Sequence, residues 1–175
     1  MSAVVEEVFL SPGDFRFATS PTRLRTILGS CVGVTLWHPT RKIGAMCHFM
    51  LPSRRRQSNE LDGKYGDEAL EMFIRQARAH HTEPDEYQLK LFGGGEMFPQ
   101  QRRDVQFGDI ARMNIHAALA LADSHDLDVI AQDLGSTGHR NVIFDLRNGH
   151  VWVRHQPIRT GTDDGNEKNK RAAGR

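Results

Sequence analysis

The 175-residue sequence has few cysteines and few aromatic residues: two cysteines, and 7% Phe, Trp and Tyr. Two cysteines are too few for the disulfide framework on which small secreted domains depend. The N-terminal segment MSAVVEEVFL has acidic residues where a signal peptide would carry Lys or Arg, so export is not expected. We therefore expect a cytoplasmic protein in which Cys31 and Cys47 are free thiols.

The sequence also lacks an excess of charge of one sign and any long apolar run. Its formal net charge is +1, which gives no electrostatic reason to expect nucleic acid as a partner. No apolar run approaches the roughly 20 residues of a membrane helix, so membrane insertion is not expected. No HExxH motif or usual Cys/His ligand spacing occurs, so a metal site is not expected. The glycine run at 93–95 matches neither the GxGxxG nor the GxxxxGK[ST] motif.

Short β-rich segments separated by turn residues dominate what is present. Residues 1–159 are expected to form a single domain, and the polar residues 160–175 a disordered tail. The expected strands cover residues 4–10, 26–37, 42–51, 88–92 and 127–132, followed by a hairpin with a type I′ turn at Asn148-Gly149. Two helices are expected, over residues 68–80 and 109–125. This pattern predicts an α+β fold with a mixed or antiparallel sheet arrangement rather than a doubly wound parallel sheet.

Apolar periodicity gives each expected helix a buried face. Asp67 is the expected cap of the first helix, whose apolar stripe contains Leu70, Phe73, Ile74 and Ala77. The second helix is expected to face inward with Ile110, Met113, Ala117 and Leu121. Asn114 follows Ile110 by four residues and is expected to make a buried structural hydrogen bond.

The register of one predicted hairpin brings a thiol and an imidazole together. If residues 38–41 form a four-residue turn, Trp37 lies opposite Lys42 and Cys31 lies opposite His48. Directly opposed side chains have Cβ atoms about 4.5–5.5 Å apart, within reach of a hydrogen bond. Cys47 then points to the other face of the sheet, which argues against a bridge with Cys31.

A cysteine and a histidine in this arrangement can form a catalytic dyad. An imidazolium at His48 would lower the pKa of the Cys31 thiol, and backbone N–H groups near Gly29 and Ser30 could stabilise an oxyanion. The same spacing also fits two ordinary core residues, because free cysteine often behaves as a small apolar side chain.

The motifs around these residues resemble one known family, the CheD chemoreceptor glutamine deamidases. The resemblance rests on LGSCV at 28–32, GAMCHFMLP at 44–52, KYGD at 64–67, KLFGGGEMF at 90–98, Asn114 and DLGSTGHR at 133–140. These motifs occur in consistent order over about residues 5–155.

The resemblance implies a β-sandwich flanked by helices, like that of the cysteine-dependent toxin deamidases. It implies conversion of glutamine to glutamate on the cytoplasmic helices of methyl-accepting chemotaxis receptors, which creates methylation sites. Cys31 and His48 take the positions of the catalytic Cys and His, and no cofactor is required. The resemblance also implies a CheC-type phosphatase as a partner in some bacteria.

The third catalytic residue departs from the family pattern. The family has a Thr six residues before the Cys, where this chain has Arg25. Thr26, five residues before Cys31, is the nearest candidate to orient His48. In one regular strand, that odd offset would direct Thr26 to the opposite face unless a bulge intervened.

Two other functions remain open at this point: a cysteine amidohydrolase with another substrate, and a non-catalytic binder of receptors or of a phosphatase. The runs Arg54–Arg56 and Arg102–Arg103 could dock acidic helices, but solvated loops are the favoured interpretation. The glycines at 93–95 and 135–138 could line a substrate groove, or could simply form turns.

Overall fold

The computed structural model describes residues 2–99 and 105–159, without the side chains of residues 105–109. The strands are β1 (Glu6–Phe9), β2 (Phe15–Thr19), β3 (Thr22–Leu28), β4 (Val32–His38), β5 (Ile43–Phe49), β6 (Gln88–Gly93), β7 (Val129–Leu134), β8 (His139–Asp145) and β9 (Val151–Gln156). The helices are α1 (Gly66–Ala79), the 3₁₀ turn η1 (Pro84–Glu86) and α2 (Val105–Ser124). The expected α+β class is confirmed.

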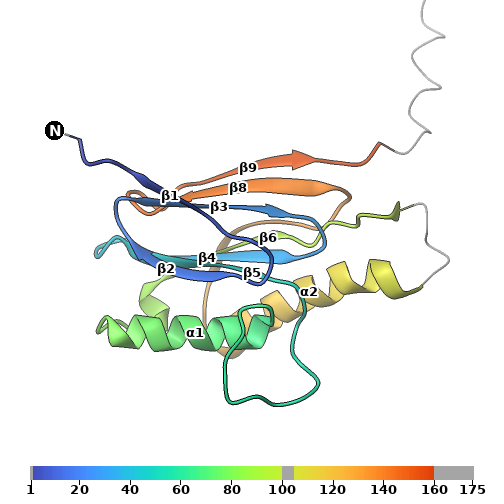
Figure 1. The fold of residues 1–175 in the computed structure, drawn as a ribbon, viewed down its shortest axis with the longest axis horizontal. Coiled ribbons are helices and arrows are strands. Elements are labelled where there is room, and N and C mark those ends of the chain that lie inside the picture. The colour runs from blue at the N-terminus through green and yellow to red at the C-terminus, as the bar shows by residue number, and fades with distance from the viewer. Residues whose placement is uncertain (1, 100–104, 160–175) are drawn as a thin grey trace, which may run out of the picture.

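The strands form two stacked mixed sheets (Figure 1). The four-stranded sheet has the order β1-β3-β8-β9, and the five-stranded sheet has the order β2-β5-β4-β6-β7. One pair in each sheet is parallel, β1 with β3 and β6 with β7, and the other pairs are antiparallel. Both α-helices cover the outer face of the five-stranded sheet, and no helix of the described residues lies on the outer face of the four-stranded sheet (Figure 1).

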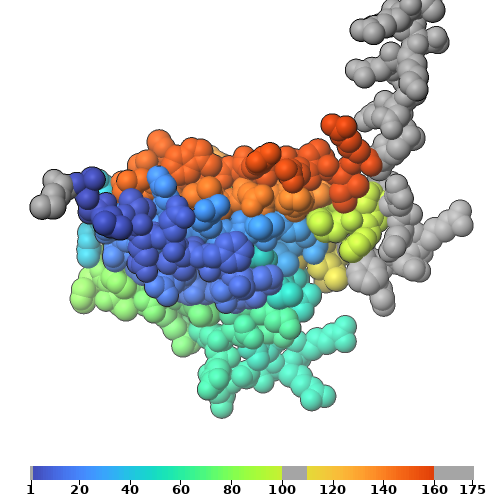
Figure 2. Space-filling view, turned by 45° about the horizontal axis from the view of Figure 1, so that its top comes forward, coloured from blue at the N-terminus to red at the C-terminus, as the bar shows by residue number. Residues whose placement is uncertain are grey.

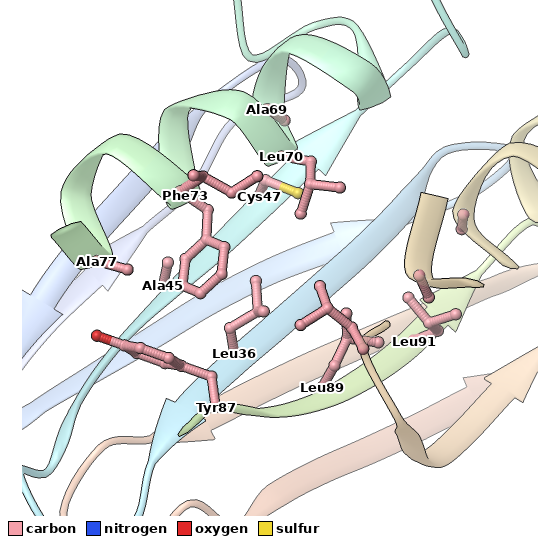
Figure 3. Close-up of a cluster of buried hydrophobic side chains, with 14 of the residues drawn as sticks. Leu36, Ala45, Cys47, Ala69, Leu70, Phe73, Ala77, Tyr87, Leu89 and Leu91 are labelled. Atoms are coloured by element: carbon pink, nitrogen blue, oxygen red, sulfur yellow. The ribbon is translucent and has the colours of Figure 1, made fainter. Parts of the chain in front are cut away.

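Two apolar layers hold this arrangement together. Side chains from both sheets meet between them, among them Leu24, Leu28, Met46 and Phe144. A second layer lies between the five-stranded sheet and the helices, where Figure 3 shows Phe73 of α1 above Ala45, Leu36 and Tyr87. The alternation of strand side chains explains the two layers, because successive residues of β5 contribute to opposite faces.

The segment predicted as one strand over residues 26–37 is two strands on different sheets. β3 ends at Leu28 in the four-stranded sheet, and β4 begins at Val32 in the five-stranded sheet. The small residues at 29–31 form the crossing between the sheets. The sequence analysis also did not identify β2.

Several boundaries and turns differ from the expectations. Tyr65, not Asp67, is the N-cap of α1 and makes no side-chain capping bond. α2 begins at Val105, and its buried positions include Ala111, Asn114, Ala118 and Ala122. Met113, expected to face inward, is 53% exposed.

The β8–β9 hairpin is confirmed, but its turn is not type I′. A type I′ turn requires positive φ at both central residues. Asn148-Gly149 has positive φ at Gly149 alone, with φ 74°. Phe144 pairs with Val151, and Asp145 N–H donates to the His150 carbonyl, so the loop is longer than two residues.

The expected tail at 160–175 lies outside the described residues. Within the described chain, neither helix is long and apolar enough to span a membrane.

Candidate active site

Cys31 lies in the crossing between the two sheets, immediately before β4. Each carbonyl of this turn accepts a hydrogen bond: Gly29 from Gly95 N–H at 2.9 Å, Ser30 from the Asn114 amide at 3.2 Å, and Cys31 from Gly94 N–H at 2.8 Å. The glycine-rich end of β6 and one side chain of α2 therefore fix the backbone of the turn. The Cys31 side chain is half-buried and packs at the edge of the layer between the sheets.

The predicted register between β4 and β5 is wrong by two residues. Trp37 pairs with Gly44 rather than Lys42, so Gly33, not Cys31, lies opposite His48. The difference arises in the turn, where Lys42 adopts φ 52° and donates its N–H to the His38 carbonyl. A shift of two residues preserves the face, and Cys31, just before β4, packs against the layer between the sheets, where His48 contacts Thr26.

Thr26 of β3 contacts His48 across the space between the sheets. Its Oγ1 lies 2.7 Å from His48 Nδ1, and the same hydroxyl donates to the Leu10 carbonyl at 2.9 Å. A hydroxyl has one hydrogen, so the oxygen of Thr26 must accept from Nδ1–H. This contact assigns the proton to Nδ1 and leaves the lone pair of Nε2 available as a base.

The crossing between sheets removes the difficulty with the position of Thr26. In one continuous strand, Thr26 and Cys31 would point to opposite faces. Because the chain changes sheets at 29–31, the inner face of β3 meets the inner face of β5, and Thr26 reaches His48 without a bulge. Thr26 and His48 are both buried, with 2% exposure each.

Burial shifts the pKa values of His48 and Cys31 in the directions that favour their neutral forms, not an ion pair. It lowers the pKa of His48 to about 4, a shift that the nearby Asp14 carboxylate partly opposes. Burial also raises the pKa of the Cys31 thiol above its ordinary value. Both shifts favour a thiol and a neutral imidazole at neutral pH, in contrast to the expected thiolate–imidazolium pair.

Cys47 lies on the opposite face of β5, as the strand parity predicted. It packs among the side chains of α1 and the five-stranded sheet (Figure 3). Burial raises the pKa of Cys47 to about 12, so this thiol is protonated and shielded. Both cysteines are free.

The Cys31 turn also requires a glycine on the neighbouring strand. Gly93 has φ 101°, and a Cβ at this position would lie 2.4 Å from the Cys31 carbonyl oxygen. The side chains of other residues are therefore excluded for both conformational and steric reasons. The N–H groups of Ser30 and Cys31 are not among the turn and loop donors found in the described chain, which leaves them available to a ligand.

Asn114 connects the two strand ends that carry Cys31 and His48. The β4–β5 ladder stops at the pair Val32–Phe49. The carbonyls of Ser30 and Met50 lie just beyond this pair, one before β4 and one after β5. Two carbonyls cannot bond each other, but the Asn114 amide donates to both, at 3.2 and 2.9 Å. The side chain is fully buried, as predicted, and its Oδ1 has no partner among the described residues.

The glycine-rich segments flank this site. A cavity of about 300 Å³ beside the Cys31 turn is lined by Gly94, Glu96, Ala111, Arg112, Ile115, Gly135, Ser136 and Thr137. Asp14 and Leu10 were not predicted as part of the site, because their contacts with His48 and Thr26 depend on pairings distant in sequence. No group of three or more potential metal-ligating side chains occurs within the described part of the chain.

Comparison with known proteins identifies one family. The sequence profile described as CheD chemotactic sensory transduction matches residues 50–155. The chain is 61% identical to a probable chemoreceptor glutamine deamidase CheD of Pseudomonas savastanoi pv. phaseolicola, over 98% of this chain and 97% of that protein. A protein of the same name from Pseudomonas fluorescens is 57% identical over 97% and 96% of the two chains. A more distant relative from Leptospira interrogans is 33% identical over 85% of this chain and 92% of its own length. The chain therefore belongs to the CheD family.

Proposed function

We propose that this protein is a cytoplasmic enzyme that deamidates glutamine side chains on the helices of chemotaxis receptors. The observation that carries the proposal is the contact between Thr26 and His48, which leaves Nε2 of His48 as a base on the face that Cys31 shares. The relatives are named as probable chemoreceptor glutamine deamidases, which supports glutamine on a receptor as the substrate.

In the first half of the proposed reaction, Cys31 attacks the carboxamide carbon of the glutamine. His48 Nε2 takes the thiol proton as the sulfur–carbon bond forms, because the resting pair is neutral. The imidazolium then donates through Nδ1 to Thr26. The N–H groups of Ser30 and Cys31, beside Gly29, are the proposed donors to the oxyanion.

In the second half, the tetrahedral intermediate collapses to a thioester. His48 returns the proton to the amide nitrogen, and ammonia leaves. His48 then removes a proton from water, which attacks the thioester carbon and releases glutamate. The thiol of Cys31 recovers its proton, so no external oxidant, reductant or metal takes part in this scheme.

Asn114 is a positioning residue in this proposal, because it touches backbone carbonyls beside Cys31 and His48 rather than the reacting atoms. Its two N–H donors hold the strand ends together where the ladder has stopped. A misplacement of reacting groups by about 1 Å can reduce a rate by about 100-fold, so such a clamp has a large effect on catalysis.

The test is mass spectrometry of receptor cytoplasmic fragments incubated with wild type and with Cys31→Ala. We expect glutamine-to-glutamate conversion by wild type and none by the variant. Conversion by both proteins, or by neither, contradicts the proposal. Binding of receptor that survives in Cys31→Ala without any conversion by wild type would instead identify a non-catalytic regulator.

The role of Thr26 is tested by a matched pair of substitutions in the same assay. Thr26→Ser retains the hydroxyl and is expected to keep most activity. Thr26→Val has the same shape without the acceptor, so it leaves Nδ1–H unpaired and is expected to lower kcat by about 100-fold, within the range for general-base catalysis. Binding to a CheC-type phosphatase remains a prediction, to be measured by co-elution of the purified proteins.

A further inference from the structure

The segment between β5 and α1 is fastened to the start of α1. The Arg54 guanidinium binds the Glu68 carboxylate with two nitrogens, one of them Nη2 at 2.7 Å from Oε2. Glu68 also accepts from the Asp62 N–H at 2.7 Å, and the Arg54 guanidinium lies 4.8 Å from the Tyr65 ring centroid. The segment is a loop with exposed Arg55 and Arg56, as expected from the sequence, and the contacts of Glu68 fix its path at Arg54 and Asp62.

A groove of about 740 Å³ opens between this segment and α2. It is lined by Leu51, Pro52, Ser53, Arg54, Arg55, Arg56, Tyr65 and Met113. In Figure 2 the teal atoms of this part of the chain stand out from the body of the molecule. Leu51, Pro52 and the exposed Met113 give the groove apolar surface, and three consecutive arginines give it positive charge.

Two of the three arginines in the groove have no counter-ion within the described residues. Glu68 offsets the charge of Arg54. Arg55 and Arg56 are exposed and form no ion pair with any residue that the structure describes. The net charge of the chain is +1, so these two cations form a local feature and are not part of a generally basic surface.

The groove lies at the end of the molecule that holds the candidate site. Leu51 follows His48 by three residues on the same chain segment. Met113 is adjacent to Asn114, whose amide binds the carbonyls of Ser30 and Met50. A segment of protein seated in the groove is therefore near the Cys31 turn.

We propose that this groove docks an acidic, amphipathic segment of the receptor helix next to the target glutamine. The inference rests on the proposed deamidase function. Carboxylates on the segment meet Arg55 and Arg56, and its apolar side chains cover Leu51 and Met113. Each deamidation adds a carboxylate to the receptor, so one converted glutamine strengthens docking for conversion of a neighbour.

The test compares Arg55→Glu/Arg56→Glu with Arg41→Glu/Arg154→Glu. The second variant makes the same change in charge at two exposed arginines, one in the β4–β5 turn and one on the outer face of the four-stranded sheet. In the groove variant we expect kcat/KM for a receptor fragment to fall by about tenfold or more at low salt, with kcat within about twofold. The control variant should match wild type, and salt should reduce kcat/KM for wild type more than for the groove variant.

A binding measurement separates this proposal from the proposed function. Fluorescence anisotropy of a labelled receptor fragment is measured with Cys31→Ala, with and without Arg55→Glu/Arg56→Glu. If wild type does not deamidate but binding still depends on the two arginines, the groove is supported and the enzymatic proposal fails. If wild type deamidates and Arg55→Glu/Arg56→Glu changes neither binding nor kcat/KM, the groove proposal is overturned. Equal losses in the control variant, no binding to Cys31→Ala, or tighter binding of a short DNA duplex than of the fragment, would also overturn it.

Discussion

Cys31 and Cys47 are the same chemical group in two different environments. Cys31 is half-buried in the turn between sheets, whereas Cys47 is 5% exposed and packs against α1. Burial raises the pKa of both thiols, so neither is a thiolate at neutral pH. We therefore expect any difference in their reactivity to come from access and from His48, the proposed base.

This environment predicts the pH dependence of alkylation. Iodoacetamide should modify Cys31 and leave Cys47 unmodified in the folded protein. The rate at Cys31 should rise by about tenfold for each pH unit between pH 7 and 9, because the thiolate is the reactive form. Peptide mass mapping over time measures both rates. A rate that is constant between pH 5 and 8 would indicate a preformed thiolate–imidazolium pair and contradict the pKa directions described here.

The prediction that Cys31 and His48 share a face of the sheet tolerates an error in register. Side chains alternate along a strand, so a shift of two residues leaves both on the same face. The contact between Thr26 and His48 was harder to predict from the sequence. This contact depends on the crossing at 29–31, and small residues in that segment fit a continuous strand as well as a turn.

At the scale of elements, α2 acts on the candidate site through one side chain. Asn114→Leu keeps the approximate shape and removes both donors, so the carbonyls of Ser30 and Met50 lose their bridge. We expect kcat to fall by about tenfold or more with a smaller change in KM, because reacting groups are displaced while the docking surface remains. The measurements are steady-state kinetics and the rate of Cys31 alkylation.

The matched control for this prediction is Leu121→Ala on the same helix. Leu121 packs against the helix-side core and makes no hydrogen bond to the Cys31 turn. Truncation of a fully buried leucine lowers stability by about 2–5 kcal/mol, and Leu121 is partly buried, so a loss at or below this range tests whether destabilisation alone reduces kcat. Equal loss of kcat in both variants at equal melting temperature would assign Asn114 a purely structural role.

Elements with strong local signals were predicted well, and those set by tertiary packing were not. The Asn148-Gly149 hairpin and the apolar stripe of α1 follow from local pattern. α2 is rich in alanine, which fits either face of a helix, so its buried stripe was predicted one residue out of place. β2 is a short edge strand with a mixed pattern, and its pairing with β5 is what defines it.

At the scale of the whole molecule, the buried His48 links stability to pH. Its pKa is about 4 in the folded state and 6.5 when unfolded, so the unfolded chain binds more protons between these values. The stability associated with the neutral, buried His48 is fully present above pH 6.5 and is lost as the pH falls towards 4. Over that window we expect the free energy of unfolding to decrease by about 3 kcal/mol on account of this residue.

Urea unfolding at pH 7, 6, 5 and 4 measures this dependence. His48→Gln removes the titrating group and is the comparison, because other histidines contribute equally to both proteins. Between pH 7 and 4, the decrease in the free energy of unfolding should be smaller in the variant by about 3 kcal/mol. Parallel curves for the two proteins would mean that His48 titrates normally in the folded state.

The contact between Thr26 and His48 has a consequence for the order in which the protein is made. All three proposed catalytic residues lie within the first fifty positions of the chain. Thr26, however, sits on β3, which is paired along its length with β8, and Thr26 itself lies opposite Val142. Because synthesis proceeds from the N-terminus, a ribosome-bound chain that has emerged as far as α2 contains Cys31, His48 and Thr26 but lacks β8. Such a nascent chain has the reactive groups without the second sheet in place, and the site is completed near the end of translation.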